Sequence, residues 1–215
     1  MSLFRSFNLD GTGVDLTADP FPTAVATWRG DLERPASGTH FGFVYDGTAD
    51  VNGMTLAAGM YFAVPGPLRV CGGQGLVVTR EGYRGFFHVG GPVEETGRLR
   101  YIDGCTDSLL IPPVLLGDPC LNLLHIPPHT RQSAHTHPSI RVGLIVSGRG
   151  TCVTPHLNHN LRPGLAFVIP AGATHSFHTI GEALRVIAYH PDSDFGPTHE
   201  CHPMVNRTIL PTEKP

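Results

Sequence analysis

The residues of this sequence best suited to chemistry are histidines in its second half. His135-Thr-His137 places two imidazoles at positions i and i+2, which face the same side of a β-strand. A third imidazole, His175, follows the turn Pro170-Ala-Gly-Ala-Thr, where the chain is expected to restart on another strand. Neutral imidazole binds Fe, Zn, Mn, Ni and Cu to varying degrees. If the three rings converge, they form a site for one divalent metal ion.

Other polar side chains are candidates for contact with a substrate in such a site. Arg141 keeps the parity of the first histidine of the pair if no bulge intervenes, so its guanidinium can clamp a carboxylate in two-point geometry. A salt bridge or an outward surface position is the alternative for this arginine. His125 and His129 precede the pair and are candidates for the mouth of the pocket, or else structural histidines. Tyr189 is a further candidate, although strand parity does not decide whether Tyr189 or His190 faces inward.

The elements that position these residues are predicted to be short β-strands. No stretch keeps apolar residues at helical spacing for three turns, and the chain is rich in Gly (26) and Pro (20). Short apolar runs recur between turns, which is typical of an antiparallel barrel or sandwich. In the second half, the predicted strands are Cys120–Ile126, Arg141–Ser147, Leu165–Ile169 and Leu184–His190. In the first half, they are Phe41–Tyr45, Met60–Val64, Gly75–Thr79 and Arg84–Val89.

The two halves of the chain resemble each other. Gly42-Phe-Val-Tyr-Asp-Gly47 is similar to Gly143-Leu-Ile-Val-Ser-Gly148, and Gly59-Met-Tyr-Phe-Ala-Val-Pro65 is similar to Gly164-Leu-Ala-Phe-Val-Ile-Pro170. We interpret this as a duplication, with chance agreement between Gly-rich β segments as the alternative. The expected organisation is an N-terminal segment 1–21, a first β unit 22–109, a second β unit 110–195 and a tail 196–215.

Only the second unit carries the histidine triad. The offsets of the repeat place no imidazole of the first unit at the three ligand positions, and they place His40 at the position of Arg141. A single histidine cannot hold a metal, so the first unit is expected to be metal-free and to serve as a packing partner or lid.

Composition narrows the class of protein. The 215 residues are 40% hydrophobic and 15% charged with a net charge of -3, so the chain is globular and has no basic stripe for nucleic acid. No apolar run approaches the roughly 20 residues of a membrane span, and the N-terminus lacks the apolar core of a signal peptide. The five cysteines are scattered without C-x-x-C spacing. We therefore expect a cytoplasmic protein with free thiols and a small-molecule substrate.

The second half resembles the cupin family. The first cupin motif, G-x5-H-x-H-x3,4-E-x6-G, is matched by His129, His135, His137, Arg141 and Gly148, with His129 in place of the first glycine and Arg141 in place of the glutamate. The second motif, G-x5-P-x-G-x2-H-x3-N, is matched by Gly164, Pro170, Gly172, His175 and Thr179. The resemblance covers about residues 115–195. It implies an all-β fold of two tandem cupin-type antiparallel barrels (double-stranded β-helices, or jelly rolls).

The resemblance also implies a function. Arginine has no lone pair for a metal, so a three-histidine centre with open positions is expected, and open positions are typical of catalytic sites. Some cupin dioxygenases use three histidines, so the first hypothesis is a non-haem Fe2+ dioxygenase acting on a small carboxylate-bearing or chelating metabolite. A redox-neutral isomerase or lyase using Zn2+, Mn2+, Ni2+ or Cu2+ as a Lewis acid is the second. A non-enzymatic sugar- or metabolite-binding cupin is the third. The resemblance further implies a homodimer.

Overall fold

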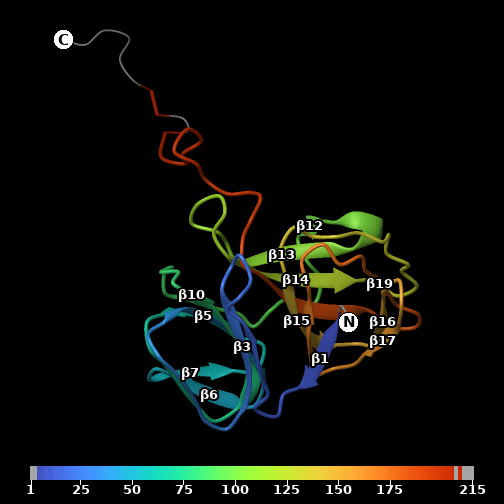
Figure 1. The fold of residues 1–215 in the computed structure, drawn as a ribbon, viewed down its shortest axis with the longest axis horizontal. Coiled ribbons are helices and arrows are strands. Elements are labelled where there is room, and N and C mark those ends of the chain that lie inside the picture. The colour runs from blue at the N-terminus through green and yellow to red at the C-terminus, as the bar shows by residue number, and fades with distance from the viewer. Residues whose placement is uncertain (1–3, 206–207, 210–215) are drawn as a thin grey trace, which may run out of the picture.

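The computed structural model describes residues 4–205 and 208–209, and their regular secondary structure is almost entirely β-strand (Figure 1). Their one helical element is the 3-10 turn η1 (Ile102–Gly104). None of their helical segments has the length or apolar character needed to cross a bilayer. The first three residues of the expected N-terminal segment, and residues 206–207 and 210–215 of the expected tail, lie outside the described part.

A seven-stranded and a three-stranded sheet form one barrel, which we call the C-terminal barrel. The larger sheet has the order β1 (Arg5–Asn8), β18 (Leu165–Ile169), β15 (Arg141–Ser147), β20 (Leu184–His190), β14 (Cys120–Ile126), β13 (Thr106–Ile111) and β12 (Leu99–Arg100). The smaller sheet has the order β17 (Asn158–Leu161), β16 (Gly150–Val153) and β19 (Ser176–His178). All pairings between these strands are antiparallel.

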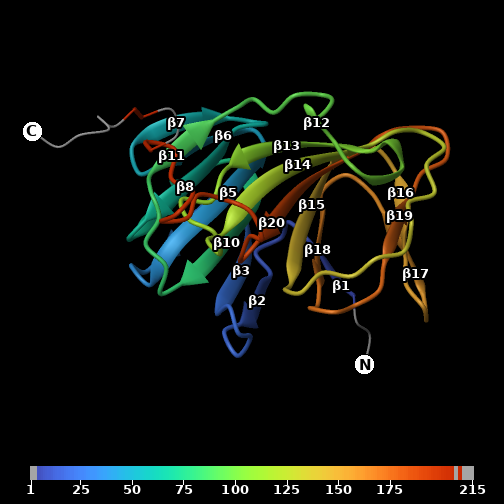
Figure 2. The ribbon, with the colours of Figure 1, turned by 90° about the horizontal axis from the view of Figure 1, so that it is seen from above.

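A six-stranded and a four-stranded sheet form the other barrel, which we call the N-terminal barrel (Figure 2). The larger sheet has the order β11 (His88–Gly90), β8 (Tyr61–Pro65), β5 (Gly38–Asp46), β10 (Gln74–Glu81), β3 (Thr23–Arg29) and β2 (Gly13–Leu16). The smaller sheet has the order β4 (Leu32–Arg34), β9 (Leu68–Cys71), β6 (Thr48–Val51) and β7 (Met54–Ala57). The fold is therefore two tandem antiparallel barrels, as predicted.

Strand prediction succeeded best in the second half. The bounds of β14, β15, β18 and β20 are those predicted from sequence. The predicted strand Arg84–Val89 is wrong in its first part, because only His88–Gly90 pairs. The two aromatic residues ahead of β11, Phe86 and Phe87, are exposed rather than packed in a sheet.

Three strands join the C-terminal barrel wholly or partly from outside the expected unit 110–195. Strand β1 comes from the expected N-terminal segment and pairs with β18. Strand β12 comes from the expected first unit and pairs with β13, and β13 crosses the expected boundary at 109/110 and pairs with β14. The division of the chain into independent units stays a prediction.

The repeat has a counterpart in the packing of the two barrels. In β15, Gly143 lies opposite Phe167, and a Cβ at Gly143 would stand 2.1 Å from Cζ of that ring. In β5, Gly42 lies opposite Phe62, and a Cβ there would also stand 2.1 Å from Cζ. In both barrels the strand therefore needs glycine, because an aromatic ring from the neighbouring strand lies flat against the backbone.

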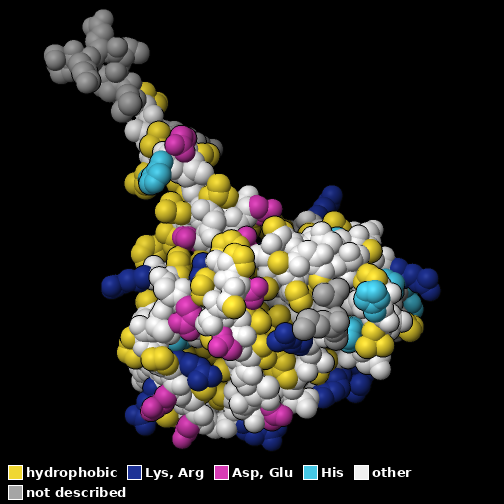
Figure 3. Space-filling model, in the orientation of Figure 1, with side chains coloured by type: hydrophobic (Ala, Val, Ile, Leu, Met, Phe, Trp, Pro, Cys, Tyr) yellow, Lys and Arg dark blue, Asp and Glu magenta, His cyan; other side chains and the backbone are white. Residues whose placement is uncertain are grey.

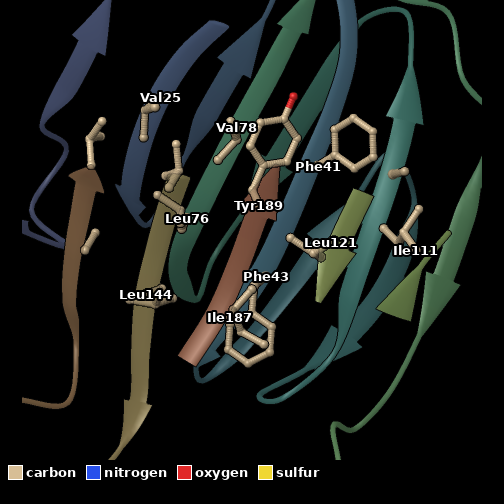
Figure 4. Packing of buried hydrophobic residues seen from close by; sticks show 14 of the residues in the cluster. Val25, Phe41, Phe43, Leu76, Val78, Ile111, Leu121, Leu144, Ile187 and Tyr189 are labelled. Atoms are coloured by element: carbon tan, nitrogen blue, oxygen red, sulfur yellow. The ribbon is translucent and has the colours of Figure 1, made fainter. Parts of the chain in front are cut away.

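The two large sheets pack against each other through one apolar cluster (Figure 4). Phe41 and Phe43 come from the N-terminal barrel, and Leu144, Ile187 and Tyr189 come from the C-terminal barrel. Each of these side chains is 3% exposed or less. Separate apolar clusters fill the interior of each barrel. The inner faces of β14, β15 and β20 are thus free to line a site within the C-terminal barrel.

Candidate metal centre

The three predicted ligands lie together inside the C-terminal barrel. One ligand atom from each of His135, His137 and His175 lies within 4.8 Å of the others. The ring centroids of the three pairs are 4.6, 5.0 and 5.2 Å apart. The sequence predicted that His135 and His137 lie on a regular strand, but they lie on an extended segment instead. An isolated antiparallel bridge joins His135 to His175, with both N–H···O distances at 3.0 Å.

Hydrogen bonds orient two of the imidazoles. Nδ1 of His135 lies 2.8 Å from the carbonyl oxygen of Ser133, and Nδ1 of His175 lies 2.9 Å from the carbonyl oxygen of Ala173. A carbonyl only accepts, so each Nδ1 carries the proton and donates it. The lone pair is then on Nε2 of each ring, free for a metal ion. Bonds of this kind fix the tautomer and direction of ligating histidines in metalloproteins.

Burial keeps His137 and His175 neutral. Burial, with further contributions from Arg141 and the neighbouring histidines, lowers the pKa of His137 to about 3. Burial is also the main cause that lowers the pKa of His175 to about 4. A metal ion binds only the deprotonated ring, so near neutral pH these two ligands need lose no proton before binding. The donor set and its charge state therefore fit a divalent transition metal.

A cavity of ≈ 50 Å³ lies against the three histidines. Its wall is mostly apolar, with one cation and a few other polar groups. The lining residues besides the histidines are Tyr101, Leu124, Gln132, Arg141, Val142, Gly143, Phe167, Ile169, Phe177, Val186 and Ala188. Within the described residues, the histidine cluster therefore borders a small cavity and has no further His, Cys, Asp or Glu grouped with it.

Arg141 lies in the wall of this cavity, although a bend at residues 138–139 interrupts the strand that the parity argument assumed. Its Nη1 donates to the hydroxyl of Ser139 at 2.6 Å and to the carbonyl of Ile140 at 2.9 Å. The same nitrogen lies 3.9 Å from Oδ1 of Asp192, which also accepts a hydrogen bond from Ser139. Nε of Arg141 is buried and has no hydrogen-bond partner in the described structure. One edge of the guanidinium is thus fixed, and the other retains a donor without an acceptor.

The remaining predicted pocket residues do not reach the cavity. His125 points from β14 to the opposite face, where its Nδ1 lies 3.4 Å from Thr106 Oγ1. His129 is exposed in a loop with a φ of 60°. Tyr189 is buried in the cluster between the large sheets, with its ring 5.3 Å from Phe41. These placements follow from strand alternation, because His125 and Tyr189 alternate with the cavity-lining residues of β14 and β20.

His190 takes the inward position for which Tyr189 was a candidate. Its ring centroid lies 6.4 Å from that of His137. Burial lowers its pKa well below the usual value for histidine. Sequence parity could not make this choice, since it fixes which residues share a face and not which face is inside.

Some cavity residues gave no sequence signal. Tyr101 comes from the segment between β12 and β13, and Gln132 comes from the extended segment before the histidine pair. Oε1 of Gln132 accepts from the backbone N–H of Phe177 at 3.1 Å. Neither residue lies in a motif, and only the folded chain brings them to the histidines.

His40 occupies the position in the N-terminal barrel that corresponds to Arg141. It is fully buried, with Nδ1 2.8 Å from Thr79 Oγ1 and Nε2 3.1 Å from the carbonyl oxygen of Pro35. Both ring nitrogens are therefore used in hydrogen bonds within the barrel, and His40 is a structural residue.

The three histidines lie within the segment that matches a known family. Residues 122–190 match the family model described as Cupin domain. This segment of the chain is a cupin domain. No curated protein matches the sequence. The match covers the strands β14, β15, β18 and β20 of the C-terminal barrel, so the cupin motifs and the histidine cluster coincide.

Solved cupin-like structures resemble both barrels of this chain. A cupin 2 conserved barrel domain protein from Leptotrichia buccalis has a TM-score of 0.60 and 10% identity, covering 86% of this chain and 95% of that chain. Salicylate 1,2-dioxygenase from Pseudoaminobacter salicylatoxidans has a TM-score of 0.58 and 11% identity, covering 83% and 74%. Oxalate decarboxylase from Bacillus subtilis has a TM-score of 0.55 and 13% identity, covering 89% and 78%. At these identities the likeness shows the fold.

Proposed function

We propose that His135, His137 and His175 bind one divalent metal ion, Fe2+ in the first place, and that the cupin is a dioxygenase for a small carboxylate-bearing metabolite. The observation that carries this proposal is the open side of the histidine cluster, which faces a cavity lined by Arg141. An open coordination side is typical of catalytic metal sites, whereas structural sites are closed by protein ligands. When bound, the metal supplies a redox-active Lewis acid with positions for substrate and dioxygen.

The protein's own residues would then bind and enclose the substrate. The unpartnered Nε of Arg141 is a charge-assisted donor to a carboxylate, and burial strengthens such a bond. Phe167, Ile169 and Phe177 form an apolar wall that excludes bulk water. The cavity of ≈ 50 Å³ favours a small molecule. Two solved cupin-like proteins carry names of carboxylate substrates, salicylate and oxalate, which supports the same substrate class here.

A redox-neutral reaction is the second candidate, and Asp107 favours it. Burial raises the pKa of this carboxyl to about 6, in the range where a side chain can both take up and release a proton. Asp107 lies opposite Leu124, a cavity residue, in the pairing of β13 with β14. A metal acting as a Lewis acid together with a carboxyl base would support isomerase or lyase chemistry.

Metal analysis and oxygen uptake separate the two candidates. The purified protein would be analysed for Fe, Mn and Zn, reloaded with Fe2+, and tested for oxygen consumption with a panel of small carboxylic acids. Substrate-dependent uptake by the iron form is expected. Turnover without uptake would replace the dioxygenase with the redox-neutral enzyme, and failure to bind any of the three metals would contradict both.

A pair of histidine variants provides the matched control. His175→Ala removes a proposed ligand, while His178→Ala removes an imidazole of β19 that lines an outer groove and not the cavity. We expect the first variant to lose the metal and the second to keep it. Cytoplasmic location and a homodimeric assembly stay predictions for this protein.

A further inference from the structure

A second polar group of the C-terminal barrel lies next to the proposed metal cavity, on strands β13 and β14. Strand β14 alternates, so Asn122 points to the same side as Leu124, which lines the cavity. Across the sheet, Asn122 lies directly opposite Ala188, another cavity residue. Asn122 therefore lies between two residues of the cavity wall.

Asn122 has an unused hydrogen-bond acceptor. Its side chain is buried, with 8% of the residue exposed, and its Oδ1 has no hydrogen-bond partner in the described structure. Its Nδ2 lies 3.5 Å from Oδ2 of Asp107. A buried polar atom without a partner costs about 1–3 kcal/mol, and such groups in folded proteins call for an explanation. A bound molecule that donates to Oδ1 would remove this cost.

Asp107 places a carboxyl group beside the amide. It faces the barrel interior because its partner in the β13–β14 pairing is Leu124. Burial is the main cause of its raised pKa, and its hydrogen bond with Asn122 opposes that effect. Tyr101 lines the cavity, and the charges of both Arg141 and Asp107 act on its phenol group.

The two sides offer opposite chemistry. Arg141 presents a buried donor without an acceptor, and Asn122 presents a buried acceptor without a donor. A simple carboxylate would satisfy Arg141 and leave Asn122 unpaired. We propose that Asn122 and Asp107 select a small acid that also carries a hydroxyl or amino group, with Arg141 binding the acid group and Asn122 accepting from the donor. This inference rests on the proposed function, since it specifies the substrate class of the same cavity.

Three acids of one carbon skeleton test the inference. Lactate, alanine and propionate differ in whether C2 carries a hydroxyl group, an amino group or neither, and their affinities would be measured by calorimetry with the protein in its metal-free and Fe2+-loaded forms. One hydrogen bond to a buried acceptor corresponds to roughly tenfold in affinity. We expect lactate or alanine to bind about tenfold more tightly than propionate. Equal affinities of all three acids would overturn the inference.

Variants of β14 assign the preference to Asn122. Asn122→Leu is expected to abolish the preference and leave propionate binding unchanged, whereas His125→Leu, on the opposite face of the same strand, is expected to keep it. A preference that persists in Asn122→Leu would come from chelation of the metal, and would also overturn the inference. If Asn122→Leu does not fold, Asp107→Asn, which keeps the side-chain shape, is expected to weaken alanine binding and not propionate binding.

The outcomes separate this inference from the function it extends. Metal-dependent oxygen uptake without discrimination among the three acids would leave the dioxygenase in place and refute the role of Asn122. Discrimination among the three acids by a protein that binds no metal would support the role of Asn122 and refute the dioxygenase.

Discussion

The contact between Gly143 and the ring of Phe167 in the C-terminal barrel predicts the effect of a single added methyl group. In Gly143→Ala, the new Cβ would stand 2.1 Å from Cζ of Phe167, where carbon atoms need about 3.5 Å, so the ring must retreat by about 1.4 Å (3.5 − 2.1). Overpacking of this kind costs roughly 1–3 kcal/mol. For a chain of this length, each kcal/mol lowers the Tm by about 2–4 °C, so we expect a fall of roughly 2–12 °C.

The same displacement is expected to reach the metal centre. Phe167 lines the ≈ 50 Å³ cavity, and its ring centroid is 5.8 Å from that of Phe177. Phe177 in turn lies 5.7 Å from the ring of His175. Disturbing groups that hold metal ligands costs roughly 10–100-fold in affinity. We therefore expect Gly143→Ala to weaken Fe2+ binding by about tenfold or more, measured by calorimetric titration of the metal-free protein.

The N-terminal barrel supplies a matched control. Gly42→Ala creates the same 2.1 Å contact, with Phe62, but that ring belongs to the core of the other barrel. Thermal unfolding followed by circular dichroism is expected to show a similar loss of Tm in both variants, while only Gly143→Ala binds Fe2+ more weakly. If the two variants bind the metal equally well, or if neither loses stability, the reasoning about the glycine–ring contact is refuted.

Three further predictions concern charge, strand parity and the loop above the cavity. The metal-free protein should lose stability as the pH falls from about 6.5 towards 4. Histidines of the unfolded chain take up protons near pH 6.5, whereas in the folded protein the pKa of His137 is about 3 and that of His175 is about 4. Urea unfolding across this pH range should show the loss, and a constant free energy of unfolding would contradict it. Tyr189→Phe should leave Fe2+ affinity and turnover unchanged, since its ring lies outside the cavity; a loss of either in calorimetric or oxygen-uptake assays would return this residue to the site. Asp103→Ala removes the acceptor of two hydrogen bonds from Ser133 (2.6 and 3.2 Å) and should speed amide exchange in residues 99–105; unchanged exchange would show that these bonds do not hold the loop.

The sequence predicted the parts of the fold that depend on local pattern. Alternation and turn residues place four strands of the C-terminal barrel, and H-x-H together with the Pro-x-Gly turn indicates which imidazoles meet. The sequence repeat also predicted two similar β units, and in each barrel the repeated glycine, Gly42 or Gly143, lies against an aromatic ring. The strands, the turns and the histidine motif each occupy a short stretch of chain, where the spacing of apolar residues and the turn residues indicate the local structure.

The rest depended on contacts that sequence spacing does not encode. His125 was a candidate because it precedes the histidine pair, with a structural role as the alternative, and strand alternation directs it away from the cavity. Parity left the choice between Tyr189 and His190 open, since only packing between the large sheets decides which face is the interior. Tyr101 and Asn122 belong to no motif, and the pairing of β12, β13 and β14 brings Tyr101 to the cavity and Asn122 next to its wall. A site assembled from remote strands is visible only after the chain has folded.

The pairing of β1 with β18 makes the C-terminal barrel depend on a strand that precedes the N-terminal barrel in the chain. Arg5 aligns with Val168, so β1 has no partner strand until 163 more residues have been added (168 − 5). Until then the edge of β1 has no hydrogen-bonded partner strand, and the large sheet of the C-terminal barrel lacks its end strand. Phe4, just ahead of β1, stacks on Phe167 with 5.4 Å between the ring centroids, so this part of the chain also packs against a residue of the cavity wall. A nascent chain that has completed the N-terminal barrel therefore still carries β1 without its partner strand.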